Sequence, residues 1–210
     1  MKNIILLTFV YCAFLSYSQE NVKTTKAIPY YKGDFNLIVN GSFPNWKSFN
    51  LQRLIEDEGT FTNESFSSIP IMGIRFEYFL SNELAFNVEG SYQSSGAKFS
   101  DKAVIGGDYS LNYQQYTATI GLDFHFTDFT TEKLDFYGGL TMSTFFLDID
   151  YESTSEFYNR SYFLGRIIEE RPIRAAIRIG ARYKLKDNIA LHLEVFRRMP
   201  FANFGLAITL

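Results

Sequence analysis

The sequence predicts an all-β protein, an eight-stranded antiparallel up-and-down barrel that spans a membrane. Apolar and polar residues alternate along eight segments, most regularly over 173–185, and a period of two residues is the signature of a strand. The connections between these segments alternate between short and long, as in transmembrane barrels. Phe and Tyr, which favour strands, number 22 and 14 in a chain of 210 residues.

The N-terminus predicts an exported protein. Lys2 is followed by an apolar run from Ile4 to Leu15 and then by Ser16-Tyr17-Ser18, with small residues at the two positions that a signal peptidase reads, a pattern typical of a secretory signal peptide over residues 1–18. The run is shorter than the roughly 20 apolar residues that a spanning helix needs. Cys12 is the only cysteine of the chain and lies in this segment, so neither disulfides nor thiolate metal sites are expected after cleavage.

The remaining chain is expected to form an N-terminal periplasmic segment, 19–33, and one barrel domain, 34–210. The net charge of the whole chain, −3, gives no basic footprint for nucleic acid. The alternation predicts strands at 34–43, 69–80, 84–93, 109–126, 135–146, 173–185, 189–198 and 203–210. Within the fourth of these, residues 109–115 alternate with the opposite phase to 116–126, which predicts a β-bulge near Gln114 and Gln115.

The three long connections, 44–68, 94–108 and 152–171, are expected outside the cell. The short turns and both ends of the barrel are expected on the periplasmic side. Apolar residues from Trp46 to Ile55 have a spacing that fits a short amphipathic helix in the first long connection. This helix is expected either to form a lid on the barrel rim or to offer a docking surface to a partner.

Each strand has one apolar and one polar face, and the orientation of these faces separates two kinds of barrel. A soluble eight-stranded barrel of the lipocalin type would bury the apolar face, whereas a membrane barrel presents it to lipid. Long strands, and charged residues on one face of nearly every strand, favour the membrane barrel. Ile177 and Ile179 are therefore expected to face lipid, and Arg178 to face the lumen.

The lumen is predicted to hold an ion-pair network, because an isolated charge in a narrow, dry interior is strongly unfavourable. The arginines of 173–185 are expected to meet carboxylates from nearby strands, with Glu194 as the nearest candidate. These pairs are either structural or part of a gated ion path. The predicted network comprises Arg75, Glu77, Glu89, Asp123, Arg174, Arg178, Arg182, Glu194 and Arg198.

The last segment, 203–210, has apolar residues at Ile208 and Leu210 and resembles the C-terminal signal that the outer-membrane assembly machinery recognises, although most such strands end in Phe. With the signal peptide, the eight strands and the loop pattern, the chain resembles the small outer-membrane barrels of the OmpA/OmpX type. It is also similar to barrel families of Bacteroidota, whose exported chains often begin after a junction such as Ser18-Gln19. The resemblance implies a fold and a place in the outer membrane, and it implies no activity.

The sequence contains no catalytic signature, and we expect no cofactor and no metal site. His125 and His192 lie on the predicted inner face, but the His-x-Ser pattern of the similar lipid A deacylases is absent. We expect a non-enzymatic barrel with a structural, surface-binding or envelope-complex accessory role. The alternative is a narrow solute or ion conductor, and a lipid-modifying enzyme is third. The expected partners are outer-membrane lipid, the assembly machinery at the last strand, and an envelope protein at the long loops.

Overall fold

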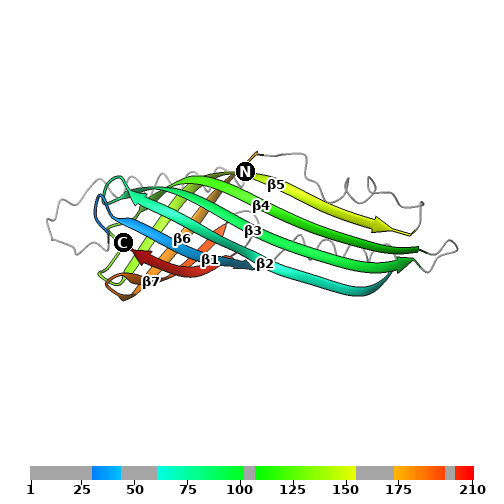
Figure 1. Cartoon of the computed structure of the whole chain (residues 1–210). Helices are drawn as coiled ribbons and strands as arrows, with labels where there is room; N and C mark the ends of the chain where they lie inside the picture. Colours follow the sequence, from blue (N-terminus) through cyan, green and yellow to red (C-terminus); the bar gives the residue numbers. More distant parts are fainter. Residues whose placement is uncertain (1–29, 44–60, 102–106, 155–172, 197–201) are drawn as a thin grey trace, which may run out of the picture.

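The computed structural model describes residues 30–43, 61–101, 107–154, 173–196 and 202–210, which form one closed antiparallel barrel. Every strand pairs with its neighbours along the chain, and β1 closes the barrel against β8 (Figure 1). The strands are β1 (Phe35–Phe43), β2 (Phe61–Phe79), β3 (Leu84–Asp101), β4 (Gly107–His125), β5 (Leu134–Ser153), β6 (Ile173–Lys186), β7 (Ile189–Phe196) and β8 (Ala202–Thr209). The predicted eight-stranded all-β class is confirmed.

In the described part of the chain, no helix is long and apolar enough to cross a membrane. The short helix expected in the first long connection falls on residues 44–60, which lie outside the described ranges.

The outer wall of the barrel is apolar where all eight strands run side by side. Ile177 and Ile179 are 43% and 65% exposed, whereas Arg178 between them is 1% exposed, so the predicted orientation of this strand is confirmed. A continuous apolar wall of this size indicates lipid rather than water as the surrounding solvent. This lipid belt includes Met72, Ile74, Phe76, Tyr78, Phe86, Val88, Tyr116, Ile120, Leu122, Leu140, Met142, Phe146, Ile177, Ile179, Leu191, Leu193, Val195, Phe204 and Leu206.

Four neighbouring strands continue beyond the belt. β2 and β4 have 19 residues each, β3 has 18 and β5 has 20. Roughly 9–11 residues suffice for a tilted strand to cross a bilayer, so these strands are about twice as long as the membrane requires. Figure 1 shows β2 to β5 running on together past the shorter strands. We call this part the extension: residues 61–71, 93–101, 107–115 and 147–153.

The extension corrects the predicted loop lengths. The connection expected at 44–68 includes the first residues of β2, and the one expected at 94–108 includes the end of β3 and the start of β4. These strand residues, 61–68, 94–101 and 107–108, are rich in Ser and carry no apolar stripe on the outer face, so the sequence predicts them as loops. Two connections, 102–106 and 155–172, lie outside the described residues.

The polarity of the strands inverts at the upper edge of the belt. Tyr92, Tyr116 and Phe146 form the last apolar row across β3, β4 and β5, and the next outward row is polar. Above this row the inner face becomes apolar instead. The buried inner cluster of the extension consists of Ala97, Phe99, Tyr109, Leu111, Tyr113 and Ile149. The extension is therefore built like a soluble sheet, with its apolar side chains inside.

This inversion explains why the bulge predicted near Gln114 and Gln115 is wrong. β4 pairs with β3 and with β5 without a register shift over its whole length. Tyr113 and Gln115 are both buried on the inner face, so the side-chain phase never changes. What changes along β4 is the surrounding solvent, from lipid to water, and the apolar residues move to the other face accordingly.

A bulge is present in β2 instead. The register between β2 and β3 shifts between Ile69 and Met72, a stretch that contains Pro70. Proline has no N–H to contribute to a ladder and is accommodated in sheets at bulges. The last described pair of β2 with β1 is Ile71 with Ser42, so Pro70 lies just beyond the point where β2 leaves the closed barrel.

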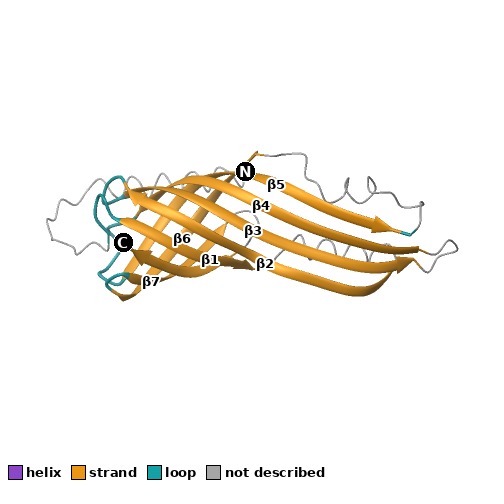
Figure 2. Ribbon diagram, viewed as in Figure 1, coloured by secondary structure: helices purple, strands orange, loops and turns teal. Residues whose placement is uncertain are grey.

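The opposite end of the barrel carries the short turns between β2 and β3, β4 and β5, and β6 and β7, which are drawn as loops in Figure 2. Both ends of the barrel sequence lie here, since Leu210 N donates to Phe35 O at 2.9 Å. In transmembrane barrels this end faces the periplasm. We call it the periplasmic mouth.

Candidate functional site: the ion network in the lumen

The charged side chains of the lumen come from the inward positions of the alternating strands. Side chains alternate along each strand, and the residues on either side of a charged residue belong to the lipid belt. The charged side chains therefore point into the lumen. The interior charges are buried almost completely: Arg75, Glu77, Asp123 and Glu194 are 0% exposed. Burial to this degree requires that each charge has a partner.

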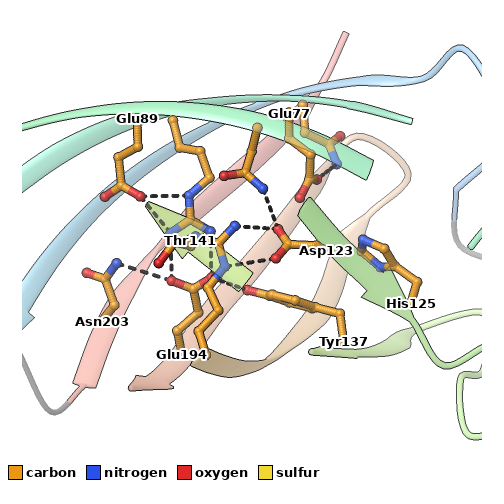
Figure 3. Close-up of polar contacts among 12 residues, drawn as sticks. Glu77, Glu89, Asp123, His125, Tyr137, Thr141, Glu194 and Asn203 are labelled. Atoms are coloured by element: carbon orange, nitrogen blue, oxygen red, sulfur yellow. Dashed lines mark hydrogen bonds and ion pairs between the residues drawn. The ribbon is translucent and has the colours of Figure 1, made fainter. Parts of the chain in front are cut away.

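Arg75 of β2 lies at the centre of the network. Its two terminal nitrogens donate to the two carboxylate oxygens of Glu194 at 2.5 and 2.6 Å, and its Nε donates to Glu89 at 2.9 Å. Arg178 donates to both oxygens of Asp123 at 2.8 and 2.5 Å. Its Nε also lies 3.4 Å from Glu194. These residues, which we call the central cluster, tie together β2, β3, β4, β6 and β7 (Figure 3).

A second pair lies beside the central cluster. Arg182 donates to both oxygens of Glu77, each at 2.6 Å, and Asn36 Nδ2 donates to the same carboxylate at 2.9 Å. The guanidinium of Arg182 lies 4.7 Å from the ring centroid of Tyr137. The Tyr137 hydroxyl in turn donates to Glu194 at 2.8 Å. Tyr137 therefore connects the second pair with the central cluster.

Two inward-facing glycines allow side chains to reach across a strand. Gly139 of β5 lies in register between Asp123 of β4 and Arg178 of β6, and this ion pair passes directly over it. Gly180 of β6 lies in the same way between Tyr137 and Glu194. A Cβ atom at either glycine would collide with the side chains that cross it. The network therefore depends on these glycines as much as on its charges.

The substitution Gly139→Ala is expected to destabilise the barrel by about 1–3 kcal/mol, the usual range for overpacking a well-packed interior. The new Cβ would overlap Asp123 Oδ1 and would lie 3.1 Å from Arg178 Nε, so the ion pair must shift. Urea unfolding in detergent micelles measures the effect. Gly90→Ala is the matched control, because a Cβ there meets nothing within 4 Å. Equal stability of the two variants would contradict the proposed role of Gly139.

The structure places the sequence-predicted residues in three groups. Arg75, Glu89, Asp123, Arg178 and Glu194 form the central cluster, and Arg182 with Glu77 forms the second pair. Arg174 is half-buried, with its guanidinium 4.8 Å from the ring centroid of Phe145. Arg198 lies outside the described residues.

The partners of the arginines differ from those expected from chain proximity. Glu194 on the adjacent β7 does lie near Arg178, but its bidentate partner is Arg75 of β2. Arg182 pairs across the lumen with Glu77, also of β2. Neutral residues that sequence reasoning left out of the network are part of it: Asn36, Asn40, Asn87, Tyr137 and Asn203 each donate to one of its carboxylates. Their inward phase was visible in the alternation.

Both histidines lie in the lumen near the periplasmic mouth. His125 Nδ1 is 3.0 Å from both carboxylate oxygens of Asp135, and His192 Nε2 is 3.5 Å from Glu194. The ring of Tyr137 lies between them, 5.2 Å from His125 and 6.1 Å from His192. Among the described residues, neither histidine hydrogen-bonds a serine or threonine hydroxyl. The geometry is that of buried structural groups.

The arrangement can hold strands together and fill the lumen. Its carboxylates accept hydrogen bonds from arginines, asparagines or Tyr137 and are therefore paired within the lumen. An eight-stranded barrel is just wide enough for side chains to fill, and here large charged side chains fill it. The closed barrel, its lipid belt and its charged interior are those of a transmembrane β-barrel of the outer-membrane type.

Comparison with known proteins gives structural similarities alone. No protein-family model matches the chain, and no curated protein matches it. The outer membrane protein OprG from Pseudomonas aeruginosa is similar in structure, with a TM-score of 0.48 and 12% identity over 88% of this chain and 99% of that one. The N-terminal β-barrel domain of Pseudomonas aeruginosa OprF has a TM-score of 0.40 and 11% identity, over 86% and 100% of the chains. The outer membrane protein AlkL has a TM-score of 0.40 and 15% identity, over 91% and 96%.

Proposed function

We propose that this protein is a non-enzymatic, non-conducting outer-membrane barrel that carries a rigid β-sheet above the membrane for binding a surface or envelope partner. The observation that carries the proposal is the inverted polarity of the extension. Strands of 18 to 20 residues continue past the lipid belt and there adopt the construction of a soluble sheet, with a buried apolar cluster. A chain that only had to anchor in the membrane would not need this second folded layer.

The closed lumen supports the same proposal. The central cluster joins five strands through bidentate ion pairs with side chains that are 0% to 12% exposed. Ion conduction requires that charges be solvated and exchangeable, whereas these charges are already neutralised by one another. The conductor considered as the alternative is therefore disfavoured. Among the described residues neither histidine hydrogen-bonds a serine or threonine hydroxyl, so the histidines give no support to the lipid-modifying enzyme.

Three partners fit this proposal. Outer-membrane lipid would surround the belt. The assembly machinery would recognise the last strand, β8, whose Phe204 and Leu206 are exposed on the outer wall. An envelope or surface protein would bind the polar outer face of the extension, where Lys98, Asn112 and Asp150 are exposed.

Site-directed photo-crosslinking in intact cells tests the proposal. A photoreactive residue at Asn112, on the outer face of the extension, is expected to give one discrete protein adduct. The matched control is the same residue at Leu140, which lies in the lipid belt and is expected to crosslink to lipid and not to that protein. Absence of any protein adduct from Asn112, Lys98 and Asp150 alike would contradict a binding role of the extension.

A further inference from the structure

The periplasmic mouth of the barrel is covered by a turn that directly precedes β1. Gly33 N donates to Phe79 O at 2.9 Å, and Lys32 N donates to Asn82 Oδ1 at 3.0 Å, so the turn is tied to β2 and to the turn that follows it. Gly33 has a φ of +95°, which residues with a side chain rarely adopt. These constraints fix the path of the chain and carry the preceding Tyr30 into the mouth.

The ring of Tyr30 closes the mouth. This side chain is 2% exposed although it belongs to no strand. It stacks on Phe79 with ring centroids 4.8 Å apart and meets the ring of His125 at 6.1 Å. Arg182 and Lys184 place their cationic groups 5.5 and 5.1 Å from its centroid. Contacts from β2, β4 and β6 thus surround the ring.

The pair of His125 and Asp135 lies directly behind Tyr30. Asp135 binds Nδ1 of the histidine through both carboxylate oxygens at 3.0 Å, a geometry in which Nδ1 carries the proton. The other ring nitrogen, Nε2, then holds the lone pair. It is buried and has no hydrogen-bond partner among the described residues. This lone pair is available to a water-borne electrophile that reaches it.

The mouth and the ion network are closed in physically different ways. The network is held by bidentate ion pairs between strands of the closed sheet, so it opens only if buried ion pairs break. The turn is held by ring contacts and by hydrogen bonds to the edge of the barrel. Its outer side is in solvent, since Tyr31 and Lys32 are exposed. A segment that is held at the edge of a fold and faces solvent on one side can open locally while the rest of the fold stays intact.

We propose that the turn from Tyr30 to Asp34 is a plug that closes the periplasmic mouth and leaves it while the barrel remains folded. Displacement of the plug uncovers His125 and the guanidinium of Arg182, and it stops at the ion pair that Arg182 forms with Glu77. The lumen thus has two closures in series, a movable one at the periplasmic end and a fixed one behind it.

Modification by diethyl pyrocarbonate tests the proposal, because the chain has 2 histidines and they lie at different depths. In the folded barrel with Tyr30→Ala, His125 is expected to react roughly tenfold faster than in the wild type, as expected for loss of local protection. His192 lies behind Tyr137 and is expected to keep its slow rate. Peptide mass analysis resolves the two sites.

Two further variants separate the plug from general damage. Tyr31→Ala removes the neighbouring ring, which is 57% exposed, and is expected to leave the modification rates of both histidines unchanged. Asn82→Ala removes the hydrogen-bond acceptor of Lys32 N without changing any lumen side chain. It is expected to increase the modification rate of His125 alone, by a smaller factor than Tyr30→Ala does.

An unchanged rate of His125 in both Tyr30→Ala and Asn82→Ala would overturn the proposal. If both histidines are modified faster in Tyr30→Ala, that substitution has opened the barrel itself. The result from Asn82→Ala then decides whether the plug exists. Faster modification of His125 alone in Asn82→Ala supports the plug. An unchanged rate of His125 in Asn82→Ala, or faster modification of both histidines, contradicts it.

Discussion

Replacing Arg75 with Met is expected to lower the free energy of unfolding by about 3–5 kcal/mol, because it leaves Glu194 buried without its bidentate counter-ion. Glu194 is 0% exposed, so water cannot replace the lost hydrogen bonds, and Glu89 loses its arginine as well. Urea unfolding of the barrel in detergent micelles, followed by circular dichroism, measures the change.

Lys98→Met is the matched control for Arg75→Met. It removes one positive charge from an exposed position of β3, and its effect is expected to stay within about 0.5 kcal/mol. A double variant, Arg75→Met with Glu194→Leu, removes both members of the pair and should recover part of the loss, since a buried pair replaced by apolar groups is often neutral. If Arg75→Met proves as stable as Lys98→Met, the central cluster does not hold the barrel together.

Leu140→Lys is expected to destabilise the barrel in lipid vesicles by about 2–4 kcal/mol, the cost of a lysine on the lipid face near the middle of the membrane. Leu140 is 66% exposed and lies in the belt of β5. In a soluble barrel, a lysine at so exposed a position would cost almost nothing. Folding titrations in vesicles with urea measure the difference.

Asn112→Lys is the matched control for Leu140→Lys. It introduces the same charge at an exposed outward position of β4, but in the extension, where the outer face is polar. Its effect is expected to stay within about 0.5 kcal/mol. Equal effects of the two lysines would mean that the belt does not face lipid.

The faces of the strands could be predicted from the sequence because side-chain direction in a strand depends only on the period of two. Ile177 outside and Arg178 inside follow from that period alone, and the structure has them so. The strand count follows for the same reason. The seventh strand was expected to reach Arg198, and its described part ends at Phe196.

The extension could not be predicted, because the alternation alone does not say which solvent each face meets. Tyr109, Leu111 and Tyr113 are apolar at inward positions, and the residues below them on the same face of β4 are polar. A reader of the sequence who expects one solvent along the whole strand must assume a change of phase, and so predicts a bulge. The bulge at Pro70 lies at the start of the predicted strand 69–80, and it was missed because the residues before it, 61–68, were expected to form a loop.

Which charged residues pair with one another in the network could not be predicted from the sequence either. Proximity along the chain predicts neighbouring strands, but in a closed barrel an inward side chain also faces the strands across the lumen. Arg182 therefore meets Glu77, and Arg75 meets Glu194, over separations of 105 and 119 residues. Glycines at Gly139 and Gly180 extend the reach of the side chains further, and their role depends on a register that the sequence does not contain.

Single-channel recording in planar bilayers tests the closed lumen most directly. The purified wild-type barrel is expected to show no discrete conductance steps at any voltage that the bilayer withstands, because the ion network fills the lumen. Tyr30→Ala opens only the periplasmic mouth and is expected to stay silent as well. Discrete steps from the wild-type protein would contradict the closed lumen and favour the conductor.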